Sequence, residues 1–347
     1  MKKVLNFLLL AMMLVVSSCG DDNKEPQKIN LATIPREYSA DNVQLLVNGF
    51  ATKVEDNVRL QMSGVHNPIE TENDMHMKLT MWPDVQLDFV VHAISHADYV
   101  EFESDFGTTI GAKLRGVAKG LIKDGAMKLD LTYEVEQKAE FESEYVYNLS
   151  PVSITTNRVI PEVEWQGTIY SGSEFKSLAL KPVMDRMREC VGGRYMSVKV
   201  NRDCSISFGS KDKVDGDLKP FPGKYYGVWT GSDISYVRTD EQGARFLSKL
   251  ICGKDEIVDK YVHNRDGDTY YYRIYFWDTN RGGMQVVFES KDDQASMYEQ
   301  YTMYVRSLQR WIDTFMAEGR TDDAKCLKLF MDKCNGGEIY WLPQGKN

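Results

Sequence analysis

The stretch Met127-Lys128-Leu129-Asp130-Leu131-Thr132-Tyr133-Glu134-Val135-Glu136 decides the fold. Apolar side chains occupy its odd positions and polar side chains its even ones. Because successive side chains of a β-strand point to opposite faces, this period of two predicts a strand with one buried face. The turn sequence Lys123-Asp124-Gly125-Ala126 comes directly before it, and Asp-Gly favours a tight hairpin turn. The stretch is therefore expected to be one arm of an antiparallel hairpin.

Similar alternation recurs through residues 41–147, between turn signals such as Val47-Asn48-Gly49 and the pair Gly107 and Gly111. The expected strands are Asn42–Lys53, Val58–Met62, Met75–Met81, Val85–Ala93, Tyr99–Phe102, Ala112–Val117 and Met127–Glu136. So many short strands predict a β-sandwich or an up-and-down barrel.

Composition narrows the class of protein. The chain has 347 residues, of which 42% are hydrophobic and 27% charged, and a formal charge of −9. This is the composition of a globular protein and excludes a collagen, a wholly disordered chain and a polytopic membrane protein. The acidic balance argues against a nucleic-acid partner. The length favours two domains.

The N-terminal sequence predicts export of the protein from the cytoplasm. Lys2 and Lys3 precede an apolar stretch, Val4–Val16, that is too short to span a membrane. Val16-Ser17-Ser18-Cys19 resembles the lipobox of bacterial lipoproteins. That resemblance implies a signal peptide over residues 1–18, cleavage before Cys19, and a lipid anchor on the Cys19 sulfur and new amine.

Residues 19–40 are expected to be a flexible tether, because Gly20–Pro26 is polar throughout. Its acidic start resembles the surface-export tethers of Bacteroidetes lipoproteins. The implied location is the outer membrane, on its periplasmic face or at the cell surface. An acidic body is repelled by anionic headgroups, so the lipid must supply the attachment to the membrane.

A second resemblance concerns residues 41–150. Val43-Gln44-Leu45-Leu46-Val47-Asn48-Gly49, Leu114-Arg115-Gly116-Val117 and Gly125–Leu131 together resemble the calycin-like (lipocalin-like) β-barrel domains of uncharacterised Bacteroidetes lipoproteins. The resemblance implies a β-barrel there. The Gly-x-Trp signature of lipocalins is absent, and Gly49-Phe50 comes nearest to it.

Pro151 and Pro161 bracket a stretch, residues 148–163, that is expected to be a domain boundary. Residues 151–347 mix helix and strand patterns, so the fold class is mainly β with an α+β C-terminal domain. Its expected helices are Ser177–Val191 (with Pro182 near its start), Thr239–Cys252 (capped by Thr239), Gln294–Gly319 and Asp322–Lys333. Its expected strands are Arg194–Asn201, Cys204–Phe208, Lys224–Arg238 as a hairpin, Asp268–Asp278 and Met284–Glu289.

Signals for catalysis or metal binding are weak. His92 and His96 have the spacing of helical metal ligands, but they stand where a strand ends, so exposed loop histidines are the better interpretation. No nucleophile elbow or phosphate loop occurs, and no cofactor is expected. Five cysteines follow Cys19, and buried thiols with at most one bridge are favoured over a disulfide framework: Cys190, Cys204, Cys252, Cys326 and Cys334.

The aromatic run Tyr270–Trp277 is the strongest candidate for binding. As a strand it places Tyr271, Arg273, Tyr275 and Trp277 on one amphipathic face, and the nearby hairpin adds Tyr226 and Trp229. Aromatic faces with polar edges suit sugar or protein surfaces. The favoured interpretation is that this face packs under the predicted helix Gln294–Gly319.

These features favour a non-enzymatic envelope lipoprotein that binds a small apolar or glycan ligand or an envelope protein. An envelope hydrolase acting on glycan or lipid is the second interpretation. A structural subunit of a surface complex is the third. A ligand cavity would favour binding, and an exposed apolar patch would favour the subunit.

Overall fold

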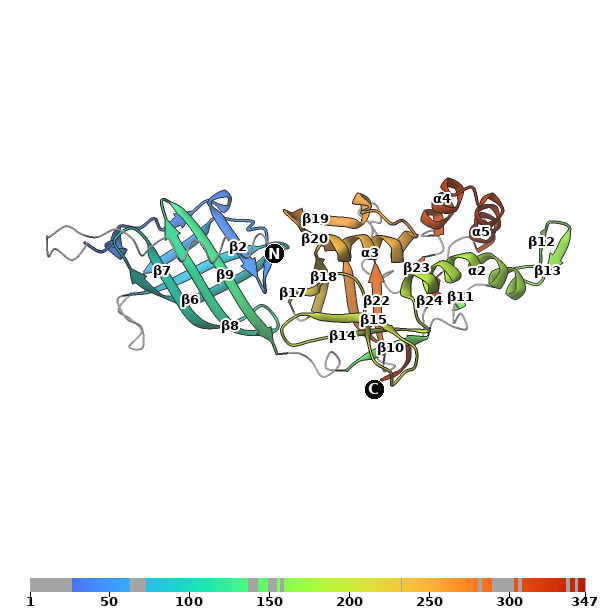
Figure 1. Cartoon of the computed structure of the whole chain (residues 1–347), viewed down its shortest axis with the longest axis horizontal. Coiled ribbons are helices and arrows are strands. Elements are labelled where there is room, and N and C mark those ends of the chain that lie inside the picture. The colour runs from blue at the N-terminus through green and yellow to red at the C-terminus, as the bar shows by residue number, and fades with distance from the viewer. Residues whose placement is uncertain are drawn as a thin grey trace.

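The computed structural model describes residues 27–62, 73–136, 143–148, 155–156, 159–231, 233–279, 283–288, 303–304, 308–334, 338–340 and 343–346, of which the side chains of 147–148, 155–156, 275–288, 303–304 and 338–346 are not described. The chain is mainly β, with a curled sheet followed by smaller sheets and a few helices (Figure 1). The predicted signal peptide and Cys19 lie outside the described residues. Among the described residues, no helix is long and apolar enough to cross a membrane.

The curled sheet contains nine strands in the order β1-β4-β5-β6-β7-β8-β9-β2-β3. Their bounds are β1 Glu37–Tyr38, β2 Val43–Val47, β3 Phe50–Ala51, β4 Val58–Met62, β5 Asp74–Met81, β6 Val85–Ser95, β7 Val100–Thr109, β8 Lys113–Lys123 and β9 Ala126–Val135. Strands β4 to β9 form an antiparallel meander, as an up-and-down topology requires, and β2 pairs in parallel with β9. A single curled sheet therefore forms here in place of the two packed sheets of a sandwich.

Turn chemistry explains the hairpins. Asn48 and Gly49 both have positive φ between β2 and β3, and Asp124 and Gly125 do so between β8 and β9. Both turns were predicted from the Asn-Gly and Asp-Gly pairs. Gly107, in contrast, lies inside β7, so the expected turn begins later and both neighbouring strands are longer than expected.

The sheet curls far enough for the chain beyond β3 to reach β5. An isolated antiparallel bridge joins Val54, just beyond β3, to Met81 at the end of β5, and the Trp82 N–H donates to the Lys53 carbonyl (2.9 Å). The interior is filled by alternate side chains, among them Met75, Met77 and Phe102, each of which is at most 2% exposed. A cavity that held a ligand would leave its lining side chains accessible to water. The described interior is therefore a packed core.

The N-terminal segment joins this fold earlier than expected. The predicted tether over residues 19–40 ends by Ile29, whose N–H donates to the His96 carbonyl (2.8 Å). Tyr38 is 2% exposed and pairs with Val58 in the sheet. Apolar side chains at Ile34 and Tyr38 give this segment a surface to bury, which a polar tether lacks.

The C-terminal half carries smaller sheets. Its four-stranded sheet has the order β17-β18-β20-β19, and its five-stranded sheet has the order β16-β15-β14-β10-β25. The bounds are β10 Tyr145–Asn148, β14 Tyr195–Val200, β15 Ile206–Lys211, β16 Lys219–Pro220, β17 Tyr225–Thr230, β18 Asp233–Thr239, β19 Val262–Asp266, β20 Thr269–Tyr272 and β25 Pro343–Lys346. Since β10 pairs with β14, the change from one sheet to the next falls between Val135 and Tyr145, ahead of residues 148–163.

Short ribbons complete this half. They are the pairs β12 Val163–Trp165 with β13 Thr168–Tyr170, and β21 Ile274–Thr279 with β22 Gly283–Phe288, and the set β11 Thr155–Thr156, β23 Met303–Tyr304 and β24 Glu338–Tyr340. The expected strand Asp268–Asp278 is thus two strands. It breaks at Arg273, after which the chain pairs with β22 instead of β18.

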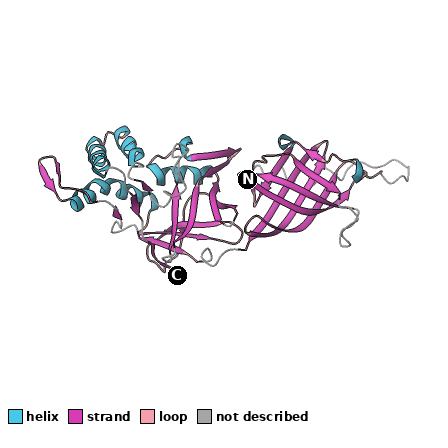
Figure 2. Ribbon diagram, turned by 180° about the vertical axis from the view of Figure 1, so that it is seen from behind, coloured by secondary structure: helices cyan, strands magenta, loops and turns pink. Residues whose placement is uncertain are grey.

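Four longer helices gather in the C-terminal half (Figure 2). They are α2 Gly172–Val191, α3 Glu241–Cys252, α4 Gln309–Ala317 and α5 Thr321–Cys334. Helix α2 packs against α5 and α3. Helix α5 matches its prediction within a residue at each end.

Capping explains where two helices begin. The expected start of α2 near Ser177 or Lys181 is wrong, because Ser171 and Glu174 form a capping box ahead of it and Pro182 lies within the helix. The expected N-cap Thr239 of α3 is also wrong. Asp240 accepts the N–H of Gly243 (3.0 Å), and the Thr239 hydroxyl instead donates to the Lys224 carbonyl (2.7 Å).

The expected long helix Gln294–Gly319 is confirmed over Gln309–Ala317 and is wrong at Met303 and Tyr304. Met303 and Tyr304 form strand β23, and helix α4 begins only at Gln309. Trp311 and Phe315, whose spacing suggested the helix, are fully buried on α4. The N-terminal part of the prediction, residues 294–302, lies outside the described residues.

Candidate functional site

Three side chains line up across the four-stranded sheet. Tyr226 on β17 is paired with Arg238 on β18, and Arg238 with Tyr271 on β20. Residues that are directly opposite in neighbouring strands point to the same face. On this face of the sheet, the Arg238 side chain therefore lies between those of Tyr226 and Tyr271.

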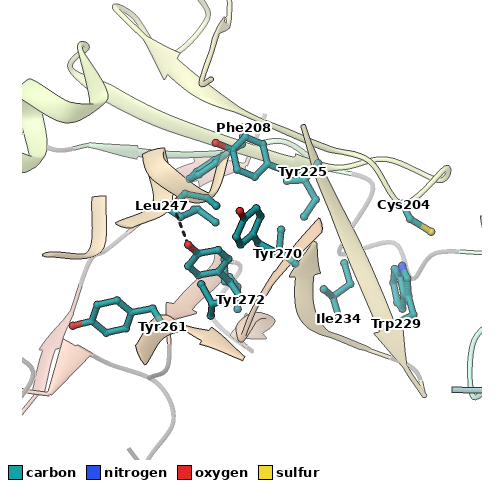
Figure 3. Close-up of a cluster of buried hydrophobic side chains, with 14 of the residues drawn as sticks. Cys204, Phe208, Tyr225, Trp229, Ile234, Leu247, Tyr261, Tyr270 and Tyr272 are labelled. Carbon is teal, nitrogen blue, oxygen red and sulfur yellow. Dashed lines mark hydrogen bonds between the residues drawn. The ribbon is translucent and has the colours of Figure 1, made fainter. Parts of the chain in front are cut away.

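The opposite face of the sheet belongs to the core of the C-terminal half. Tyr225, Tyr270 and Tyr272 point there, toward Phe208 and Leu247 (Figure 3). The Tyr272 hydroxyl donates to the Ala244 carbonyl of α3 (3.0 Å). Helix α3 thus covers this face, and the row with Arg238 faces away from it.

The curled sheet covers the row instead. The Phe50 and Tyr226 rings lie 4.8 Å apart between centroids, and Trp82 lies 4.7 Å from Tyr271 and 4.6 Å from Tyr236. The Tyr271 hydroxyl donates to the Ala51 carbonyl (3.3 Å). We call this meeting of β3 and the β5–β6 turn with β17, β18 and β20 the junction.

Backbone contacts fix the rim of the junction. The Asn48 amide donates to the carbonyls of Tyr133 (3.2 Å) and Asp203 (3.0 Å), and Asn48 Oδ1 accepts the Tyr133 N–H (2.9 Å). The N–H groups of Val135 and Ala112 donate to carbonyls of the C-terminal half. Hydrogen bonds from several parts of the curled sheet therefore fix the position of one half relative to the other.

Arg238 lies at the centre of the junction. It is 2% exposed, and its Nη1 donates to the Thr52 hydroxyl (3.1 Å). Its Cζ stands 5.6 Å from the Phe50 ring centroid and 5.9 Å from that of Tyr226, within reach of a cation–π interaction. Nε and Nη2 have no hydrogen-bond partner among the described residues, and no described carboxylate pairs with this guanidinium.

Titratable groups beside Arg238 are held in their neutral forms. Burial raises the pKa of the Tyr133 phenol far above its ordinary value, and Arg238 offsets only part of this rise. Burial likewise raises the pKa of the Cys204 thiol to about 12. Trp229 lies beside that thiol (Figure 3). Loss of solvation outweighs the attraction of the cation at both groups, as a dry site requires.

The junction brings together some of the sequence-predicted binding residues. Tyr226 is half-buried and Tyr271 is fully buried, and both flank Arg238. Arg273 is half-buried, with its Cζ 5.7 Å from the Tyr236 ring centroid at the edge of the junction. Trp229 is 1% exposed and lies in the core near Cys204.

Tyr275 and Trp277 lie on β21, beyond the break at Arg273, and their side chains lie outside the described residues. The described part of the predicted amphipathic face therefore ends at Arg273. Its described buried member, Tyr271, packs against the curled sheet, so the expected cover by the Gln294–Gly319 helix is wrong for this residue.

Sequence reasoning missed Arg238, Phe50, Thr52 and Trp82. One signal was present in Val237-Arg238-Thr239, a charged residue in a strand whose neighbours are all buried. The expected hairpin Lys224–Arg238 assigned Arg238 to no face, because nothing local shows that Phe50 and Trp82 cover it.

The histidines and cysteines form no centre of their own in the described chain. His92 Nδ1 lies 2.8 Å from Asp74 Oδ1, and His96 stacks on Tyr99 with centroids 4.2 Å apart. No group of three or more potential metal ligands occurs among the described residues. In the described chain the five cysteines after Cys19 lie outside any disulfide, and Cys190 is less buried than the other four.

A hollow of about 740 Å³ marks the outside of the curled sheet, where β6 and β7 separate. Their ladder stops at Ala93 and Phe102, and the His92 N–H donates instead to the Ser104 hydroxyl (2.5 Å). Both described cations in the hollow have carboxylate partners, Lys78 with Asp88 (3.4 Å) and Arg59 with Glu37 (3.4 Å). The hollow therefore offers polar surface without an unpaired charge of the kind found at Arg238.

Comparison of the chain with protein-family models, with curated proteins and with solved structures found no match.

Proposed function

We propose that this chain is a lipid-anchored, non-enzymatic binding protein of the bacterial cell envelope, in which a calycin-like sheet serves as a rigid support and the junction is the binding site. One observation carries the assignment of the site. Arg238 is buried between two halves of the molecule with two guanidinium nitrogens unpartnered. Buried charges in proteins are nearly always paired. An unpaired buried guanidinium therefore indicates that a ligand supplies the missing hydrogen-bond acceptor.

The order of the curled sheet supports the calycin-like part of the proposal. Its antiparallel meander and the bridge between Val54 and Met81 fit a small barrel. Small-ligand carriage inside it is not part of the proposal, because the described interior is packed with Met and Phe side chains.

The point at which the chain enters the fold is consistent with the curled sheet acting as a rigid support. Ile29 is bonded at the Ser95–His96 end of β6, and Trp82 reaches the junction from the other end. Eleven strand residues span about 35 Å at about 3.3 Å each. The junction therefore lies about one strand length from the point where the chain enters the fold.

The anchor is tested by fatty-acid labelling and membrane fractionation of whole cells. The wild type and a Cys190→Ala control should carry label and sediment with membranes, and Cys19→Ala should do neither. A labelled, membrane-bound Cys19→Ala protein would refute the anchor.

Binding is tested by native mass spectrometry of the gently purified mature chain, with denaturing extraction in parallel. The proposal expects a copurifying mass that disappears on denaturation. A chain that is free of any ligand, and that binds nothing when cell-envelope extract is added back, would contradict the binding function.

The third interpretation, a structural subunit, is favoured by one surface. The hairpin of β12 and β13 projects from the end of the molecule opposite the curled sheet (Figure 1). Ile169 on β13 is 70% exposed, and the nearby Val159 is 97% exposed. Apolar side chains on a projecting hairpin suit contact with another protein.

A further inference from the structure

Arg238 stands out because its charge is buried without compensation. Arginine stays protonated in proteins, and moving a cation out of water costs several kcal/mol unless an acceptor replaces the lost solvent. The described neighbours supply the Thr52 hydroxyl, the phenols of Tyr133 and Tyr271, and two ring faces. These contacts satisfy Nη1 and part of the charge.

The unsatisfied nitrogens form one edge of the guanidinium. Nε and Nη2 lie side by side on the edge away from Nη1, and both lack a hydrogen-bond partner. This edge presents two parallel N–H groups, the geometry that binds two oxygens of one carboxylate or phosphate. The two N–H groups without a partner therefore indicate that the missing acceptor is an anion with two adjacent oxygens.

The surroundings favour a carboxylate on an organic group. Phe50, Tyr226 and Tyr271 provide aromatic walls, and the phenol of Tyr133 remains neutral. Such walls suit an apolar or aromatic substituent. Inorganic phosphate carries more charge and would lose more solvation in a site of this kind.

Tyr226 provides the route of entry. It is the half-buried member of the ring pair that covers Arg238, whereas Phe50 is 8% exposed and Tyr271 is fully buried. The backbone of Tyr226 is held by its bridge to Ser205 and by its pairing with β18. Rotation of the side chain alone can therefore move its ring away from Arg238 without unpairing the sheet.

We propose that Arg238 anchors the carboxylate of a small organic acid, which enters the junction past Tyr226 and is held through Nε and Nη2. The inference names the ligand chemistry of the proposed binding function and rests on that function. It does not depend on the lipid anchor.

Titration calorimetry of the full mature chain in detergent tests this. The probes are sodium benzoate, sodium acetate, inorganic phosphate and sodium chloride at constant ionic strength. Benzoate should bind saturably with one site, acetate more weakly, phosphate more weakly than benzoate, and chloride without a measurable site. The Nε–H resonance of Arg238 in a nitrogen-15 spectrum should shift with the same benzoate dependence.

Variants distinguish the contribution of the paired N–H groups of Arg238 from that of its positive charge. Arg238→Lys keeps the cation but loses the paired N–H groups, so benzoate affinity should fall at least 10-fold. Arg238→Met should abolish the site. Arg245→Lys, on the exposed face of α3, should bind as the wild type does. Tyr226→Ala should speed benzoate association, and near-ultraviolet circular dichroism checks that each variant is folded.

Several results would overturn the inference. These are an affinity for benzoate that survives Arg238→Lys unchanged, a folded wild type that binds no carboxylate, and phosphate binding tighter than benzoate binding. If the copurifying mass persists in Arg238→Met, the inference fails and the binding function stands. If the wild type has neither a copurifying mass nor a carboxylate site, both fail.

Discussion

Two buried cations in this molecule have opposite surroundings. Lys211 on β15 is 6% exposed, and its ammonium lies 2.8 Å from the Glu144 carboxylate, which also accepts a hydrogen bond from Ser197 (2.5 Å). Arg238 on β18 is 2% exposed and has no described carboxylate beside it. The Lys211 ammonium is thus paired with a carboxylate of the chain itself, whereas Arg238 has two nitrogen donors without a hydrogen-bond acceptor.

The difference separates a structural charge from a binding one. A buried pair contributes little net stability, but removing one partner leaves the other charged and desolvated. An unpaired buried charge is costly from the start, and it persists where it serves recognition. Removing each cation should therefore change stability in opposite directions.

The largest effect is expected at Lys211. Lys211→Met should lower the free energy of unfolding by about 3 kcal/mol, because Glu144 is left in a mostly buried site without its partner. Urea denaturation measures the change. Lys219→Met removes an exposed pair with Asp212 (2.6 Å) and should cost less than about 0.5 kcal/mol. Equal losses in the two variants would mean that Lys211 is not a buried pair in solution.

Alkaline pH probes the dryness of the junction. The Cys204 pKa is raised from 9.0 to about 12, so the unfolded chain loses this proton first. Its contribution to stability is complete below pH 9 and is lost as the pH rises toward 12. Between pH 8.5 and pH 10.5 we expect a loss of about 2 kcal/mol from this thiol.

Comparing the wild type with Cys204→Ala isolates that contribution. The variant should lose less stability than the wild type over the same pH range in urea denaturation. A wild-type thiol that reacts rapidly with an alkylating reagent at pH 9 without unfolding would contradict the dry junction.

A smaller effect of the opposite sign is expected at Arg238. Arg238→Met should raise the free energy of unfolding of the ligand-free chain by about 1 kcal/mol, since removal of an unpaired buried charge outweighs the lost Thr52 bond and ring contacts. Thermal and urea denaturation both report it. A destabilisation as large as that of Lys211→Met would show that Arg238 has a partner in the folded chain.

The smallest effect is expected from acid. Burial raises the pKa of Glu144, but the hydrogen bonds from Lys211 and Ser197 lower it more, so the folded value lies below 4.5. Its contribution to stability is present above that value and is lost as the pH falls through the folded pKa. Unfolding curves below pH 4.5 should show this loss in the wild type and less of it in Glu144→Gln. An unchanged slope in the variant would remove Glu144 as its source.

The curled sheet could be predicted from the sequence because its strands bury one face and expose the other. Met127, Leu129 and Leu131 alternate with polar side chains, and alternation is the signal that such a strand leaves. The Asn48-Gly49 and Asp124-Gly125 turns then limited the strand ends.

The junction could not be predicted in this way. Strand β20 buries both faces, Tyr270 and Tyr272 toward α3 and Tyr271 toward the curled sheet, so no alternation distinguishes them. The contacts that define the second face span 186 residues between Thr52 and Arg238 and 220 between Ala51 and Tyr271. Local patterns found the tyrosines but contained no information about what covers them.

A crystal structure of the mature chain grown with benzoate would show whether Arg238 holds a carboxylate. We expect the two carboxylate oxygens to lie about 2.7–2.9 Å from Nε and Nη2 of Arg238, with the Tyr226 ring rotated from its ligand-free position. A carboxylate side chain of the protein itself on that edge, with benzoate absent from the junction, would contradict this expectation.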